Sequence, residues 1–303
     1  MTLAIAKKLN NDILMYSDMK ITNDSDCKAN GFDGRIKTII VNPKMCISYA
    51  GNADRALVTM ESLFYLSDEG KDTDYLIKYL LNRHIEGNNE TEYLVGIDSN
   101  GKKLYRIRNG VLEEGSIFWI GDIDAFSKYQ EYYLSNIRYV YNDQTVSNLI
   151  GQCFDKVAED YSVPSVESPT VYTTVEEDGF NYGCKVFMNA PNQTIHLEKN
   201  EWKSIDFGDA AKGGFGYASI VPKTPGHSCY GLKFFQGKVA YIFNYRISTE
   251  PLVVKYTSNL DLIESIKSIW DVDMVCDWEY TPCSIKKNFT KYNKNREKRR
   301  KLL

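Results

Sequence analysis

The second residue of the chain, Thr2, has the side chain whose type and position most directly suggest chemistry. A threonine at a mature N-terminus can act as a nucleophile, because its own α-amino group can serve as the general base for its hydroxyl. The pKa of an α-amino group, about 7.7 to 8.0, lies close to working pH, so the group takes and returns a proton at little cost. The initiator methionine is normally trimmed before a small residue, and its removal would expose Thr2 without a propeptide.

The sequence contains few of the residue patterns that other kinds of catalytic or binding site require. The three histidines, His84, His196 and His227, lie far in sequence from any cysteine or carboxylate at ligand spacing, so we expect neither a metal site nor a cofactor. The seven cysteines form no CxxC pair, which favours a reducing cytoplasm. Segment 213–216 is rich in glycine, but no Lys-Ser or Lys-Thr pair follows it, so it is typical of a β turn rather than a phosphate loop.

Length and composition indicate a folded chain with a large core. The chain has 303 residues, of which 43% are hydrophobic and 25% charged, as in ordinary globular proteins. No stretch approaches the roughly 20 apolar residues that span a bilayer. The lysines near the N-terminus follow the short apolar run rather than precede it, so we expect no cleaved signal peptide and a cytoplasmic location.

The expected elements follow the order strands, two helices, strands, two helices, strands. Such pairs of helices between blocks of antiparallel strands favour an α+β fold, a four-layer α/β/β/α sandwich of antiparallel sheets, over alternating βαβ units. Expected strands lie at about 3–6, 13–16, 36–41, 45–49, 93–97, 104–108, 117–120, 170–175 and 185–188, and expected helices at 53–66, near 75–80, 123–135 and 145–159. Residues 3–6 and 13–16 are expected to pair as a hairpin around the turn residues Asn10-Asn11-Asp12. Residues 104–108 are expected to pair with 117–120, and the last two strands with each other.

The chain divides by pattern into three parts. Residues 1–190 form the sandwich domain, and residues 191–285 form an accessory β-rich region with a hairpin over 231–243 and a helix over 260–270. Residues 286–303 form a basic tail that we expect to be disordered, with nine lysines and arginines against Glu297. The tail therefore carries a charge of +8, which leaves −11 on residues 1–285.

The N-terminal region resembles the proteasome β-subunits and the bacterial proteasome-like peptidase of the N-terminal nucleophile hydrolase superfamily. The resemblance covers about residues 2–190 and implies the same sandwich fold and a threonine-type peptidase or amidase. It rests on the order of the helices and on three segments of sequence, which are Thr2-Leu3-Ala4-Ile5-Ala6, Ser17-Asp18 and Ala50-Gly51-Asn52-Ala53-Asp54.

The resemblance assigns four catalytic residues. Thr2 is the nucleophile, and Asp18 follows it at the family's spacing of sixteen residues. Lys37 stands fourteen residues before Gly51, as the family's catalytic lysine does, although Arg35 competes for this role. A cation here lowers the cost of the Thr2 alkoxide, and lysine is favoured because arginine cannot deprotonate. Gly51 is expected to offer its backbone N–H to the oxyanion of the tetrahedral intermediate.

Two departures from the family pattern leave an alternative open. Asp122 stands where the family usually has a serine followed by glycines. The family's Asp-x-x-Ser-Gly segment has no clean copy, and Asp160 with Ser162 is the nearest match. The chain is therefore either a divergent hydrolase or a catalytically inactive proteasome-like scaffold or interaction module.

The expected partners follow mainly from the resemblance. It implies a peptide or unfolded protein as substrate and a homo-oligomer that encloses the nucleophile. It also makes an ATPase a possible partner. Nucleic acid is not expected as a partner except weakly through the basic tail, and no membrane association is expected.

Overall fold

A computed structural model describes residues 2–20, 34–139, 142–160, 162–166, 169–189 and 215–276. Helices and antiparallel sheets occur in separate blocks along the chain, so the predicted α+β class is confirmed. The chain divides into two compact units, which we describe in turn. The first unit comprises Met1–Gly183, Pro222–Tyr230 and Ile242–Val253, and the second comprises Cys184–Val221, Gly231–Tyr241 and Val254–Leu303.

The first sheet of the first unit contains the N-terminal strand. Its strand order is β10-β9-β2-β1-β8, and every pairing is antiparallel. Residues 3–6 of β1 and all of β2 are buried on both faces, which explains why 3–6 and 13–16 are continuous apolar runs rather than an alternation. The strands span Leu3–Lys8 (β1), Ile13–Asp18 (β2), Ile117–Gly121 (β8), Thr170–Glu176 (β9) and Gly179–Tyr182 (β10).

The second sheet of this unit is an antiparallel meander in the order β3-β4-β5-β6-β7. Its strands span Thr38–Asn42 (β3), Met45–Gly51 (β4), Thr91–Asp98 (β5), Lys102–Arg108 (β6) and Val111–Gly115 (β7). The expected pairing of residues 104–108 with 117–120 is wrong, because β7 follows the Asn109-Gly110 turn at once and takes the place beside β6. The chain then crosses to the first sheet, where β8 pairs with β1.

Four helices of the first unit lie close to their predicted positions. They span Ala53–Asp68 (α1), Thr73–Glu86 (α2), Ile123–Asn136 (α3) and Asp143–Ala158 (α4), with a short 3-10 helix at Ile137–Tyr139 after α3. Each α-helix begins after an Asn or Asp whose side chain accepts a hydrogen bond from a backbone N–H of the first turn. These N-caps are Asn52, Asp72, Asp122 and Asn142.

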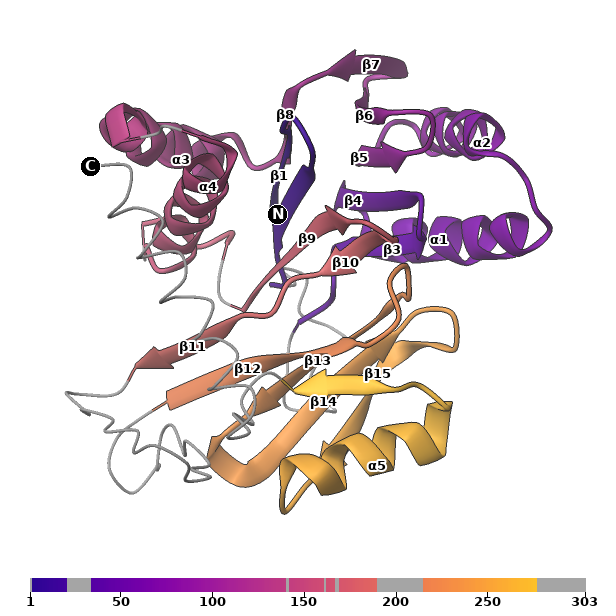
Figure 1. Ribbon diagram of the computed structural model, residues 1–303. Helices are drawn as coiled ribbons and strands as arrows, with labels where there is room; N and C mark the ends of the chain where they lie inside the picture. Colours follow the sequence, from indigo (N-terminus) through magenta and orange to yellow (C-terminus); the bar gives the residue numbers. More distant parts are fainter. Residues whose placement is uncertain are drawn as a thin grey trace, which may run out of the picture. The chain divides into compact units, whose positions relative to one another are not determined.

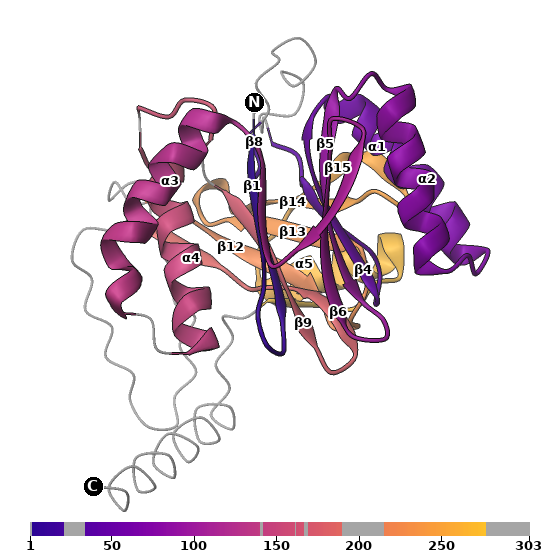
Figure 2. The ribbon, with the colours of Figure 1, turned by 90° about the horizontal axis from the view of Figure 1, so that it is seen from above.

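The two helix pairs of the first unit cover different sheets. One apolar cluster joins β1 and β2 to α3 and α4, with Leu3, Ile5, Ile150 and Phe154 among its fully buried members. The pair α1 and α2 instead packs on the second sheet. Figure 2 shows α3 and α4 on one side of β1, and α1 and α2 beyond β4 and β6 on the other. Residues of the two sheets also touch directly, as in the hydrogen bond from the Thr38 hydroxyl to the Ser17 hydroxyl at 2.8 Å.

The last part of the chain forms a third sheet in the order β11-β12-β13-β14-β15, with β16 paired to β12 (Figure 1). In sequence order, these strands span Val186–Asn189, Phe215–Pro222, Cys229–Phe234, Val239–Asn244, Ser248–Lys255 and Met274–Cys276. This part of the described chain also has a 3-10 turn at Gln236–Lys238 and the helix α5 at Asn259–Trp270. The predicted hairpin over 231–243 and the predicted helix are both present. The strands β12 to β15 contribute residues to both compact units, so neither unit is one continuous segment of sequence.

The predicted hairpin between residues 170–175 and 185–188 is also wrong. A two-residue turn after Glu176 brings Gly179–Tyr182 alongside β9 at once, and the later strand β11 pairs with β12 in the third sheet. The first unit accordingly breaks at Gly183, a few residues before the expected boundary at 190. Glycines 213 and 214 and the basic tail lie outside the described residues.

Within the described part of the chain, no helix is both long enough and apolar enough to cross a membrane.

Candidate active site

Thr2 lies at the start of β1, where its backbone is held from two directions. Its carbonyl oxygen accepts a hydrogen bond of 2.7 Å from the N–H of Asp122, directly after β8. The next residue, Leu3, donates its N–H to a carboxylate oxygen of Asp18 at 3.1 Å. Only 6% of the surface of Thr2 is exposed. The peptide group between Thr2 and Leu3 is therefore held at both its oxygen and its N–H.

Asp18 and Lys37 form a buried ion pair beside this backbone. The Lys37 Nζ lies 2.7 Å from the Asp18 carboxylate, and the side chains are 5% and 0% exposed, respectively. Lys37 also donates to the carbonyl oxygen of Lys20, and the N–H of Lys20 binds the same carboxylate at 3.0 Å. One carboxylate therefore joins the lysine to the residue that follows Thr2.

Burial controls the protonation of both members of this pair. It raises the pKa of Asp18, while the attraction of Lys37 and the hydrogen bonds from Lys37, Leu3 and Lys20 oppose that rise. Burial likewise lowers the pKa of Lys37, and attraction to Asp18 opposes the fall. A lysine with a lowered pKa can exchange a proton closer to neutral pH than an exposed lysine can.

The structure distinguishes Lys37 from its competitor Arg35. The guanidinium of Arg35 forms an ion pair of 2.8 Å with Asp54, which lies in the first turn of α1 and is 84% exposed. Lys37 alone of the two reaches Asp18.

Gly51 ends β4 with a backbone conformation that favours glycine. Its φ angle is +109°, and a Cβ at this position would lie 2.0 Å from the carbonyl oxygen of Glu90. The residue before it, Ala50, lies near the start of β1, because a Cβ built on Gly121 would be 3.3 Å from the Ala50 Cβ and 1.9 Å from the Thr2 carbonyl oxygen. The end of β4 is therefore next to the backbone of Thr2, and Gly51 itself is exposed.

Asp122 has a structural role at the start of α3. Its carboxylate caps α3 by accepting hydrogen bonds from the N–H groups of Asp124 and Ala125 at 2.8 and 3.1 Å. Desolvation acts to raise its pKa, but hydrogen bonds from Ala125, the Ser165 side chain and Asp124 outweigh this effect, so the pKa lies below its usual value. The side chain of Asp122 therefore caps α3, while the backbone N–H of the same residue holds Thr2.

The serine that reaches Asp122 is Ser165, which the sequence analysis did not select. Asp160 and Ser162, the nearest match to the family segment, instead bond to each other, because the Ser162 N–H and hydroxyl both donate to the Asp160 carboxylate. The hydroxyl of Tyr132 donates to the same group at 3.0 Å. No sequence signal marks Ser165, because its contact depends on how the loop after α4 returns to the sheet.

Glu92 and Arg108 are two further residues of this region that the sequence analysis missed. One carboxylate oxygen of Glu92 accepts the N–H of Gly121 at 3.1 Å, and the other lies 2.7 Å from the Nε of Arg108. The sequence did carry a signal for this ion pair. An Asn100-Gly101 turn sets the β5–β6 register, and continuing that register one step past Tyr93 and Ile107 places Glu92 opposite Arg108.

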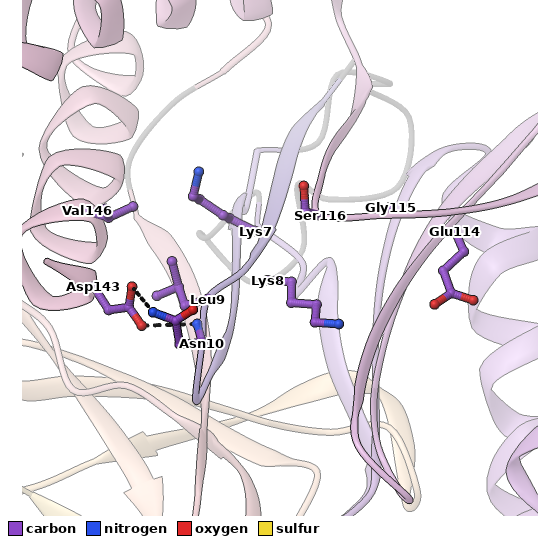
Figure 3. Close-up of a pocket in the computed structure, with 9 residues that line it drawn as sticks. All are labelled: Lys7, Lys8, Leu9, Asn10, Glu114, Gly115, Ser116, Asp143 and Val146. Atoms are coloured by element: carbon purple, nitrogen blue, oxygen red, sulfur yellow. Dashed lines mark hydrogen bonds between the residues drawn. The ribbon is translucent and has the colours of Figure 1, made fainter.

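A surface hollow of about 720 Å³ lies at the other end of β1, away from Thr2. Its lining includes Lys7, Lys8 and Ser116, and Figure 3 shows Asn10 of the hairpin turn bound to Asp143 of α4 at its edge. This hollow contains none of the four predicted catalytic residues. Among the described residues, no group of three or more His, Cys, Asp or Glu side chains is placed to hold a metal ion.

Comparison with protein-family models and with curated proteins gives no match for this chain. Its functional assignment therefore rests on the geometry around Thr2.

Proposed function

We propose that this protein is an N-terminal nucleophile hydrolase, a threonine-type peptidase or amidase in which removal of Met1 exposes Thr2 as the nucleophile. The observation that carries the proposal is the buried ion pair of Asp18 and Lys37, which is hydrogen-bonded to the backbone directly after Thr2. The arrangement of the first unit supports it, since helix pairs on the two sheets are what the four-layer α/β/β/α sandwich of that superfamily requires.

The proposed reaction uses the two ends of Thr2. Its hydroxyl oxygen attacks the carbonyl carbon of the scissile amide while the α-amino group takes the hydroxyl proton. The same proton then passes to the leaving amine as the C–N bond breaks, which leaves an ester on Thr2. A water molecule attacks the ester with the α-amino group as base, and the acid is released with the Thr2 hydroxyl restored.

The neighbouring groups have separate roles in this reaction. The charge of Lys37 stabilises the Thr2 oxygen as it loses its proton, and Asp18 holds that lysine in place. The N–H of Gly51 receives the oxyanion of the tetrahedral intermediate, because a strand end without a side chain lets the backbone approach the substrate. We assign an extended peptide or unfolded protein as the substrate class and a homo-oligomer as the working form, both from the resemblance.

A second candidate function is an inactive scaffold that keeps the fold and self-association but has lost catalysis. The observation that favours it is Asp122, whose carboxylate is committed to capping α3 in the place where the resemblance expects a serine. The two candidates differ in whether Thr2 is needed for turnover.

The deciding experiment compares Thr2→Ala and Thr2→Ser with the wild type on a fluorogenic peptide. Both substituted residues are small, so both variants are expected to lose Met1. Thr2→Ala should lower turnover by at least about 100-fold with an unchanged melting temperature, because no hydroxyl remains to attack. Thr2→Ser should retain turnover. A Thr2→Ala variant as active as the wild type would exclude the hydrolase proposal, and no turnover in any of the three proteins would favour the scaffold.

A further inference from the structure

We infer that Glu92, held by Arg108, is a positioning residue that fixes the backbone of Thr2 against the end of β4. This inference rests on the proposed function of Thr2 for its catalytic meaning. It concerns a contact between the two sheets of the first unit, since Glu92 belongs to β5 and its hydrogen-bond partner Gly121 ends β8.

Two successive N–H groups at the end of β8 point in opposite directions. The N–H of Gly121 binds the Glu92 carboxylate at 3.1 Å, and the N–H of Asp122 binds the Thr2 carbonyl oxygen at 2.7 Å. The same short piece of backbone is therefore held by Glu92 on one side and holds Thr2 on the other.

The contact between this backbone and Thr2 is direct. Gly121 has a φ of +101°, and a Cβ at its position would lie 1.9 Å from the Thr2 carbonyl oxygen, so only a glycine fits. A shift of Gly121 toward or away from the second sheet must therefore move Thr2 with it.

Glu92 also fixes the partner strand of the site. It lies opposite Ala50 in the β4–β5 pairing, and the next pair in that register is Gly51 with Thr91. The residue that holds Gly121 is thus beside the strand end that carries the candidate oxyanion donor. Glu92 sets the separation between the nucleophile and Gly51, which no hydrogen bond within a single sheet can do.

Arg108 restrains the carboxylate in this role. Its Nε lies 2.7 Å from Glu92, and its guanidinium lies over the Trp119 ring of β8 at 5.2 Å from the ring centre. Both oxygens of the Glu92 carboxylate make charge-assisted contacts, one with Arg108 and one with the N–H of Gly121. The Glu92 side chain is 19% exposed, so these contacts are largely shielded from water. Trp119 stacks in turn on Phe126 of α3 at 4.2 Å, which anchors the arginine to a packed element.

The test compares Glu92→Ala and Glu92→Gln with a matched control, Glu113→Ala. Glu113 also forms an ion pair with an arginine of the neighbouring strand, Arg106, whose Nε and Nη2 both donate to one Glu113 carboxylate oxygen. Glu92 differs because it also accepts the N–H of Gly121 from the other sheet. A misplacement of about 1 Å costs on the order of 100-fold in rate, so Glu92→Ala should lower kcat by about 10- to 100-fold and change KM by less than about twofold. Glu92→Gln keeps an oxygen acceptor for Gly121 and should recover most of the rate, and Glu113→Ala should match the wild type.

Amide hydrogen exchange gives a readout that does not depend on catalysis. The N–H of Gly121 should exchange at least about tenfold faster in Glu92→Ala than in the wild type or in Glu113→Ala, because it loses a charged acceptor. Equal kcat and equal Gly121 exchange in Glu92→Ala and Glu113→Ala would overturn the inference. Retained activity in Thr2→Ala would instead overturn the proposed function, and Gly121 exchange would still decide whether Glu92 holds this backbone.

Discussion

Breaking the buried ion pair of Asp18 and Lys37 should produce a large and pH-dependent loss of stability. The variant Lys37→Met keeps the length and most of the volume of the lysine side chain but removes its charge. Breaking a buried ion pair by removing one partner costs about 3 to 5 kcal/mol. The N–H groups of Leu3 and Lys20 still bind the carboxylate, so we expect a cost at the low end of this range, about 3 kcal/mol at pH 7.5.

The direction of the pH dependence follows from the pKa of the group that is left behind. Burial raises the pKa of Asp18, and without Lys37 the backbone N–H groups of Leu3 and Lys20 are left to oppose the rise. The native state then binds the proton more tightly than the unfolded state, so the stability of Lys37→Met falls as the pH rises from about 4 to the folded pKa. The slope is at most about 1.4 kcal/mol per pH unit. The variant should therefore be closer to the wild type at pH 5 than at pH 7.5.

The complementary variant Asp18→Asn should show the opposite sign. Burial lowers the pKa of Lys37, and without Asp18 this shift is no longer opposed by an anion. The native state then releases the proton more readily than the unfolded state, so the stability of Asp18→Asn rises with pH between the folded pKa and about 10.4.

Urea unfolding of the three proteins at pH 5, 7.5 and 9 measures both trends. A Lys37→Met cost below about 1 kcal/mol at pH 7.5, or the same pH slope in all three proteins, would refute the assignment of a buried ion pair.

Three further predictions concern other parts of the described chain. Gly121→Ala should lower the free energy of unfolding, measured in urea, by about 3 kcal/mol or more, because there is no space for its Cβ. The control Gly70→Ala, whose Cβ meets open space, should lower it by about 1 kcal/mol. Equal losses would contradict the packing around Gly121. Burial raises the pKa of the Cys46 thiol to about 12, so alkylation of the native protein at pH 8 should modify the partly exposed Cys184 and spare Cys46. Mass spectrometry identifies the modified residues, and equal rates at the two cysteines would contradict the burial of Cys46. The pKa of Asp122 lies below its usual value, so Asp122→Asn should be less stable than the wild type by about 0.5 to 1 kcal/mol at pH 7. The difference should vanish as the pH falls below about 4 and the wild-type carboxylate gains its proton. A difference that stays constant with pH would contradict an ionised cap.

The elements that the sequence predicted well are those with a local signal. The helices α1 to α4 show apolar residues at helical spacing, and each begins directly after an Asn or Asp cap. The hairpin of β1 and β2 was also predicted, because two short apolar runs are separated by turn residues.

The strands that the sequence predicted poorly are those whose partners are decided by distant parts of the chain. The strand β7 carries two glutamates and lies at the edge of its sheet, so its sequence lacks the apolar pattern of a buried strand. The strand β11 was paired with β9 by proximity, but the nearer β10 occupies that position. Choices of this kind depend on which backbone hydrogen bonds remain open after the local elements have formed.

The candidate site was predictable to the extent that it depends on spacing from Thr2. Asp18 and Lys37 were selected by their intervals, and the structure brings these two together. Ser165 and Glu92 could not be selected in this way, because each is placed by a contact far away in sequence. Ser165 bonds to the Asp122 side chain, and Glu92 accepts the N–H of Gly121 at the end of β8.

Covalent labelling of Thr2 tests the central claim most directly. A peptide epoxyketone can be captured by the hydroxyl and the α-amino group of an N-terminal threonine together, which closes a six-membered ring on that residue. We predict that mass spectrometry of the treated protein finds a chain that begins at Thr2 and carries one inhibitor on this residue, with no label in the Thr2→Ala variant. An unlabelled chain that still begins at Met1 would contradict the account.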